Sequence, residues 1–129
     1  MSIYLNHVEK RIEQWGYWAE RDKTGTETKA TCLANHKPDI SNLKTIIIDI
    51  EDVEALAIDA IISELNVVDP VLNQIAWWRY VKRLSVPEVA DKVRKGQTFI
   101  RNSLSSITTY VAGAIPEELD KKYREIIFS

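Results

Sequence analysis

Two helix signals separated by a short turn, between Leu84 and Leu104, constrain this chain more than any other feature. Ser85 is a good N-cap, proline follows two residues later, and Glu88 completes a capping box. This pattern predicts a helix to about residue 93. Residues 94–96, Arg-Lys-Gly, predict a turn, and a second helix is expected over 97–114.

The two predicted helices carry the residue types that a helix-turn-helix needs. Ala90 provides a small side chain where the second helix would cross the first. Apolar residues would hold the pair together: Val89, Val93, Ile100 and Leu104. We therefore expect a helix-turn-helix within residues 84–114.

The second helix would then present a polar face, which consists of Gln97, Thr98, Arg101, Asn102 and Ser105. Arginine pairs with guanine, and asparagine or glutamine pairs with adenine, in the major groove of DNA. Basic residues around this face would contact phosphates: Lys82, Arg83, Lys92, Arg94 and Lys95. These ten residues are the predicted DNA-binding site, and double-stranded DNA is the predicted partner.

The turn departs from the usual motif at two positions. Arg94 stands where glycine is usual, and Lys95 stands where an apolar residue is usual. The glycine comes two residues later, at Gly96, so we expect a turn that is reshaped or shifted. The alternative is an ordinary helical hairpin that does not bind DNA.

Charge is distributed unevenly along the chain, although the formal net charge is only −2. Residues 39–69 are strongly acidic, with Lys44 as their one basic residue, whereas residues 79–101 are strongly basic. A local basic face attracts phosphate over roughly 8–10 Å whatever the total charge. Two ordinary solvated faces of opposite sign are the alternative.

The remaining pattern predicts a small all-α fold in a single domain, residues 1–129. Further helices are expected over residues 3–21, 53–65 with Asp52 as N-cap, 70–83 with Asp69 as N-cap, and 116–127. Residues 22–50 lack helical periodicity and predict a long irregular loop. Its end, Ile46 to Ile50, is expected to be an extended lead-in to the next helix.

Four tryptophans invite a functional interpretation. Trp15 and Trp18 share one helix face, and core packing is the more natural role for them. Trp77 and Trp78 are adjacent and must point in different directions. We expect one of this second pair in the core, and the other could be an exposed anchor for a partner.

Nothing in the sequence indicates catalysis, a cofactor, a metal or a small-molecule substrate. Cys32 is the single cysteine, and His7 and His36 lack neighbouring ligands at metal-site spacing. Helix-start capping accounts for the acidic residues Asp52 and Glu54. With no apolar run of membrane length and no leader-like N-terminus, we expect a cytoplasmic protein that does not enter a membrane.

Several short pieces occur together in an order that resembles a known family. They are Gln14-Trp15-Gly16-Tyr17-Trp18, then Ala55-Leu56-Ala57-Ile58-Asp59-Ala60, then Trp78-Arg79-Tyr80, and finally the basic helix-turn-helix. This order is similar to that of the phage antitermination protein Q family, of the compact type found in lambdoid prophages. The resemblance covers roughly residues 8–112.

The resemblance implies a transcription antiterminator acting in the host bacterium. Such proteins bind DNA near the phage late promoter and engage a paused RNA polymerase that still carries its sigma factor. They then travel with the polymerase and suppress pausing and termination. The resemblance also implies that the helix-turn-helix is like sigma factor region 4, with Gln97, Thr98, Arg101 and Asn102 contacting DNA. Relatives with a zinc-binding cysteine cluster exist, but this chain has only Cys32, so we expect no zinc.

Two other functions fit the residues alone. A helix-turn-helix repressor or activator would usually dimerise on a palindromic site. A protein-interaction module that no longer touches DNA would explain the basic turn at Arg94 and Lys95.

Overall fold

The computed structural model describes residues 2–24 and 50–128, and every regular element in these two ranges is helical. The α-helices are α1 (Ile3–Trp18), α4 (Asp52–Val68), α5 (Pro70–Ala76), α6 (Val86–Val93), α7 (Gln97–Ala114) and α8 (Glu117–Phe128). Two π-helical turns, η1 (Ala19–Thr24) and η2 (Trp77–Val81), extend α1 and α5. The expected all-α fold is confirmed. Most of the predicted loop, residues 25–49, lies outside the described residues.

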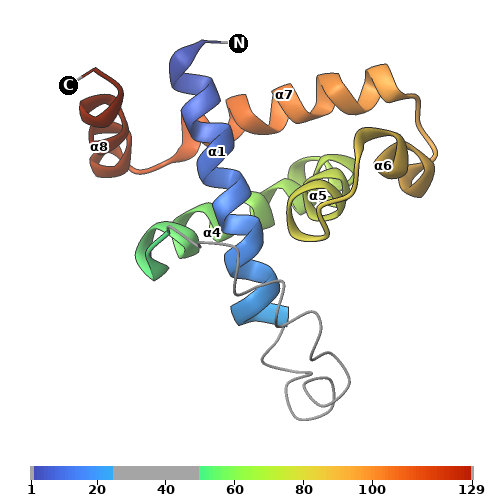
Figure 1. The fold of residues 1–129 in the computed structure, drawn as a ribbon, viewed down its shortest axis with the longest axis horizontal. Helices are drawn as coiled ribbons and strands as arrows, with labels where there is room; N and C mark the ends of the chain where they lie inside the picture. Colours follow the sequence, from blue (N-terminus) through green and yellow to red (C-terminus); the bar gives the residue numbers. More distant parts are fainter. Residues whose placement is uncertain (1, 25–49, 129) are drawn as a thin grey trace.

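Helix α1 is the centre of the molecule (Figure 1). It packs against α4, η2, α7 and α8, so elements distant in the sequence meet along its length. Val8, Ile12 and Trp15 of α1 are buried in one core with apolar residues from the other helices. Trp18 is buried as well, so the predicted core role of the first tryptophan pair is confirmed.

Several predicted boundaries need correction. The first helical element continues through η1 to Thr24, past the expected end at residue 21. The N-cap position of α4 is Glu51 rather than Asp52, although the Glu51 side chain makes no capping hydrogen bond, and α4 extends to Val68. The Asp69 cap is confirmed, because its carboxylate accepts the backbone N–H groups of residues 71 and 72.

Helix α5 does not continue as a regular α-helix to Arg83. Its last turn widens into η2, where Lys82 N–H donates to the carbonyl of Trp77, five residues earlier, at 3.1 Å. Arg83 then adopts a left-handed conformation (φ 57°) and ends the element. The hydrophobic periodicity of the sequence does not reveal the change from α-helix to π-helix, because the pattern of apolar residues is nearly unchanged.

The widened turn packs directly against Gly16 of α1. A Cβ atom built on Gly16 would lie 2.0 Å from the carbonyl oxygen of Tyr80 and 2.5 Å from its carbonyl carbon. Real side chains cannot approach backbone atoms that closely. Glycine at this position is therefore required for α1 to cross η2.

Glu54 has a different role from the predicted one in helix capping. Its carboxylate is buried and accepts two hydrogen bonds from the Arg11 guanidinium, at 2.8 and 2.9 Å. The Tyr123 hydroxyl of α8 donates to the same carboxylate at 2.5 Å. Burial alone would raise the pKa of Glu54, but the hydrogen bonds from Arg11 and Tyr123 hold it below its ordinary value. The three residues join α1, α4 and α8.

Helix α8 depends strongly on this network, because Tyr123 is its one buried residue among those described. A second polar contact joins the Tyr4 hydroxyl of α1 to Asp120, and the Arg124 guanidinium lies 4.5 Å from the Tyr4 ring centroid. Burial, followed by the Asp120 contact, raises the pKa of Tyr4 to about 12. Helix α8 therefore docks through the buried Tyr123 ring, with Leu119 also packed against the core, and through these polar contacts.

Candidate nucleic-acid interface

The polar face of α7 is exposed along its first three turns. All five predicted residues, Gln97, Thr98, Arg101, Asn102 and Ser105, are accessible to solvent. Arg101 makes one long contact with the Gln97 side chain, at 3.5 Å, and this contact is itself at the surface. The structure therefore leaves these side chains accessible, as an interface with DNA would require.

The opposite side of the α6–α7 pair is apolar and packed. Val89 and Ile100 are completely buried, Ala90 and Leu104 are nearly so, and Val93 is half-buried against the core. The predicted packing residues of the two helices are thus confirmed. Because the pair also contacts α1, α4 and α5, the polar face of α7 lies on a helix that is packed from behind.

Local capping explains why α6 begins where it does. The Ser85 hydroxyl accepts the Glu88 backbone N–H, and the Glu88 carboxylate accepts the Ser85 backbone N–H at 2.9 Å. The predicted capping box is therefore present. Hydrogen bonds from the Ser85 backbone and then its side chain lower the pKa of Glu88.

The turn between α6 and α7 keeps the backbone conformation that usually calls for glycine. Arg94 has φ 58° and ψ 50°, which is left-handed, and Lys95 N–H donates to the Ala90 carbonyl at 3.0 Å. Gly96 has an ordinary extended conformation with φ −73°. The idea that glycine had moved along the turn is therefore wrong, because Arg94 itself takes the strained position.

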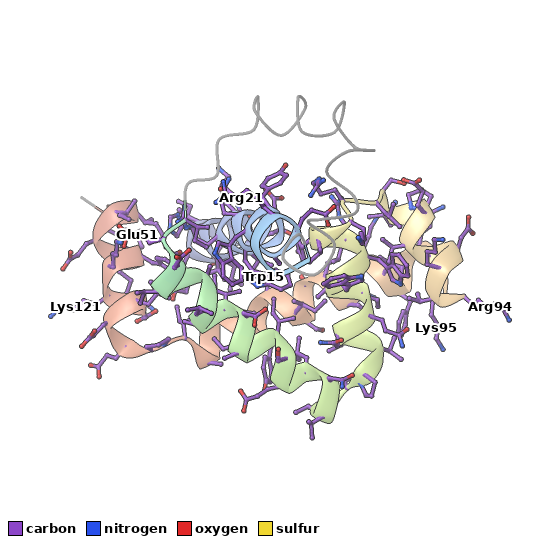
Figure 2. The ribbon with its side chains drawn as sticks, turned by 90° about the horizontal axis from the view of Figure 1, so that it is seen from below. Trp15, Arg21, Glu51, Arg94, Lys95 and Lys121 are labelled. Carbon is purple, nitrogen blue, oxygen red and sulfur yellow. The ribbon has the colours of Figure 1, made fainter. Side chains whose placement is uncertain are left out.

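Three of the predicted phosphate-contacting residues cluster at the end of α6. Arg94 and Lys95 lie together at one end of the molecule, whereas Lys121 of α8 lies at the other end (Figure 2). The Lys95 ammonium is 5.5 Å from the Phe99 ring centroid, and the Lys92 ammonium is 5.2 Å from that of Trp78. All three basic groups are exposed, so they remain accessible to phosphates.

Lys82 and Arg83 lie before α6 and contact other parts of the chain. Lys82 is half-buried, with its ammonium 3.5 Å from the Glu20 carboxylate and 5.6 Å from the Trp77 ring centroid. The Arg83 guanidinium is 5.0 Å from the Tyr17 ring centroid and donates to the Val81 carbonyl at 3.0 Å. The structure therefore does not join these two residues to the cluster at the turn.

Two aromatic features near this interface are not predicted by the sequence. Phe99 is 43% exposed at the start of α7, and the Lys95 ammonium of the preceding turn lies over its ring. Helical spacing does not indicate this contact, because Lys95 precedes the helix. Trp77 and Trp78 are both half-buried, and each lies beneath a lysine. The expected division into one core and one exposed tryptophan is therefore wrong.

Within the described residues, no three His, Cys, Asp or Glu side chains are grouped so as to hold a metal ion. Cys32 and His36 lie outside those residues. The helices that the structure describes include none of the length and apolar character needed to cross a bilayer.

Comparison with known proteins supplies the family. No curated protein and no solved structure matches the chain. The family model of phage antitermination protein Q matches residues 5–120, which span α1 to the start of α8. This match covers most of the chain and confirms the resemblance drawn from the Trp-Gly-Tyr-Trp and Ala-Leu-Ala-Ile-Asp-Ala pieces. The chain belongs to the phage antitermination protein Q family.

Proposed function

We propose that this antitermination protein binds double-stranded DNA near a phage late promoter through the polar face of α7. The exposure of all five residues of that face, on a helix pair whose other side is packed, carries the proposal. Arg101 and Asn102 supply the bidentate donors and acceptors that distinguish bases in the major groove. Gln97, Thr98 and Ser105 extend the contact along the groove.

Lys92, Arg94 and Lys95 would contact the phosphates beside the groove. They surround the turn that leads into α7, so they flank the base-contacting residues on the same helix pair. Lys82 and Arg83 are secondary candidates, because their charges already interact with neighbouring groups of the protein. We expect their removal to weaken DNA binding less.

DNA binding would recruit the protein to RNA polymerase. In this proposal the protein loads onto a polymerase that has paused near the promoter with its sigma factor still bound. It then remains with the polymerase and suppresses pausing and termination, in the cytoplasm of the host bacterium. In this proposal the α6–α7 pair resembles sigma factor region 4. No catalytic step is involved.

A transcription assay tests the whole proposal. A template carries the phage late promoter followed by a terminator, and readthrough is measured with purified host polymerase with and without the protein. We expect readthrough to rise with the protein and to require the promoter-proximal DNA element. Equal termination in both reactions would contradict the proposed function.

DNA binding is tested separately by titrating the same element at several salt concentrations. Arg101→Ala should lower affinity by about 1–3 kcal/mol and relax discrimination between bases. Lys95→Ala should weaken binding to all sequences and reduce the salt slope by about 1. Lys121→Ala is the matched control, because it removes a positive charge from the far end of the molecule (Figure 2).

These results separate the alternatives. A dimer with a symmetric footprint and no effect on termination would favour a simple repressor or activator. Affinity that is unaffected by salt and by Arg101→Ala would contradict DNA contact through α7 and favour a protein-interaction module.

A further inference from the structure

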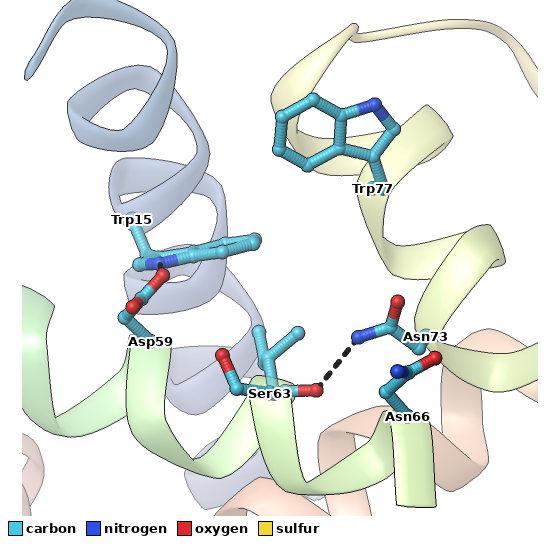
Figure 3. A pocket seen from close by; sticks show the side chains of 7 residues that line it. Trp15, Asp59, Ser63, Asn66, Asn73 and Trp77 are labelled. Carbon is cyan, nitrogen blue, oxygen red and sulfur yellow. Dashed lines mark hydrogen bonds between the residues drawn. The ribbon is translucent and has the colours of Figure 1, made fainter. Parts of the chain in front are cut away.

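A pocket with aromatic and polar walls lies between α1, α4, α5 and η2. Its volume is about 310 Å³, and its lining residues are Trp15, Asp59, Ile62, Ser63, Asn66, Asn73 and Trp77. Figure 3 shows Trp15 and Trp77 on two sides of the opening, with the carboxylate and carboxamide groups contributed by α4 and α5. None of these residues belongs to the predicted DNA-binding site.

The polar groups of the pocket are held in place by the protein. The Trp15 indole N–H donates to the Asp59 carboxylate at 3.2 Å, and the Asn73 amide donates to the Ile62 carbonyl at 2.9 Å. Trp15 is almost completely buried, and Trp77 is half-buried. A ligand would therefore meet walls that are already ordered, which reduces the entropy lost on binding.

The lining of the pocket carries negative charge. Asp59 is the one charged residue of the lining, and helices α4 and α5 contain no lysine or arginine. Glu54 of α4 is already paired with Arg11, and the Lys82 ammonium lies over the Trp77 ring at the edge of the pocket. The Asp59 carboxylate attracts cations and repels phosphate groups.

The chemistry of the lining selects one kind of cation. Indole faces attract cationic groups, and the Lys82 ammonium already lies 5.6 Å from the Trp77 ring centroid. A planar guanidinium can stack on an indole while its N–H groups donate to a carboxylate and to carboxamide oxygens. Ammonium lacks the planar shape, and a nucleotide would bring phosphates near the Asp59 carboxylate.

We propose that the Trp15–Trp77 pocket binds the guanidinium group of an arginine side chain from a protein partner. The molecule then has two binding regions of opposite character. The α6–α7 pair contacts DNA phosphates, and the pocket on α4 and α5 anchors a basic protein surface. Arginine binding by the pocket does not require DNA contact by α7, so it can be tested separately from the proposed function.

The test uses N-acetyl-L-arginine methylamide as the probe and the indole N–H signals of the full-length protein in ¹⁵N-correlation spectra. We expect the Trp15 and Trp77 signals to shift in a saturable way, whereas Trp18, which does not line the pocket, does not respond. The citrulline analogue has almost the same shape without the charge. It should bind at least about tenfold more weakly, because the charge-assisted hydrogen bonds are lost.

Two variants with the same change in charge locate the site. Asp59→Asn keeps an acceptor for the Trp15 indole but removes the carboxylate from the pocket, and it should weaken arginine binding about tenfold. Glu64→Gln lies on the same helix but outside the lining, and it should leave binding nearly unchanged.

Two results would overturn the assignment. One is equal affinity for the arginine and citrulline probes, or an equal loss of arginine affinity in Asp59→Asn and Glu64→Gln. The other is adenosine or guanosine monophosphate shifting the same two signals at lower concentration than the arginine probe, which would make the pocket a nucleobase site. Arg101→Ala should leave arginine binding intact, so a failure of DNA binding is distinguishable from a failure of this proposal.

Discussion

The α6–α7 pair and the region around α1 are stabilised by different kinds of contact. The pair depends on a local cap at Ser85, a three-residue turn and apolar contacts between neighbouring helices. The region around α1 depends on contacts between residues far apart in the chain. Arg11 meets Glu54 across 43 positions, and Glu54 meets Tyr123 across 69. We therefore expect the two regions to respond differently to substitution.

This difference matters for function because the exposed polar residues of α7 contribute little to the fold. They can be changed to test the proposed DNA contact while their support remains intact. The region around α1 does not tolerate such changes. Gly16 allows the close approach of η2, and Arg11 and Glu54 form a largely buried ion pair. Single substitutions in the two regions test this contrast, and the largest effect is expected at Gly16.

Gly16→Ala should be the most damaging single change. The added Cβ would lie 2.0 Å from the Tyr80 carbonyl oxygen, and backbone on both sides must move to relieve the clash. We expect the free energy of unfolding to fall by more than about 3 kcal/mol. Chemical denaturation monitored by tryptophan fluorescence measures it.

Gly113→Ala is the matched control for that variant. A Cβ on Gly113 meets nothing within 4 Å, and the residue lies in the last turn of α7. The substitution should stabilise the protein by no more than about 0.5 kcal/mol, because the higher helix propensity of alanine counts for less at a helix end than in its middle. If both variants lost a similar free energy of unfolding, the destabilisation by Gly16→Ala would come from helix geometry and not from the crossing of α1 and η2.

Glu54→Gln should be the next most damaging change. It keeps the shape of the side chain but leaves the Arg11 guanidinium, whose side chain is 17% exposed, without its carboxylate. Breaking a buried ion pair from one side costs about 3 kcal/mol. Glu64→Gln, at an exposed position of the same helix, should leave stability unchanged. Equal effects on thermal unfolding would refute a special role for the Arg11–Glu54–Tyr123 network.

Acid should weaken the same network. The pKa of Glu54 lies below its ordinary value of 4.5, because hydrogen bonds from Arg11 and Tyr123 outweigh the effect of burial. Its stabilising contribution is therefore complete above about pH 4.5 and is lost as pH falls through the folded-state pKa. The stability difference between the wild type and Glu54→Gln should shrink between pH 6 and pH 3. A constant difference across this range would contradict the lowered pKa.

Arg94→Gly should have a smaller effect on stability than Gly16→Ala or Glu54→Gln, and in the opposite direction. Arg94 is held in the left-handed region at φ 58°, where glycine is not strained, so the variant should gain about 1 kcal/mol. Arg94→Ala removes the same guanidinium but keeps the strain. Both variants should lose DNA affinity equally, while only the glycine variant is stabilised. Unchanged DNA affinity in both would remove Arg94 from the interface.

The sequence by itself determined the helices that begin and end on local signals. The capping box at Ser85 and the proline after Asp69 specify where α6 and α5 start, because a backbone N–H needs a partner whatever the tertiary context. The polar face of α7 could also be predicted from the sequence, because polar and apolar residues placed on a helix of 3.6 residues per turn fall on opposite sides. The uneven charge along the chain was also visible.

Only the tertiary structure decided which distant groups meet. Trp15 and Trp77 are 62 positions apart, yet they line one pocket with Asp59 because α1 crosses both α4 and η2. Glu54 fits a helix start by sequence, but its environment is a buried arginine and a tyrosine from the last helix. Helix propensity and helix capping depend on residues that are only a few positions apart in the chain. Burial, close approach and ion pairing depend on packing between helices, and a single sequence does not encode those neighbours in any local pattern.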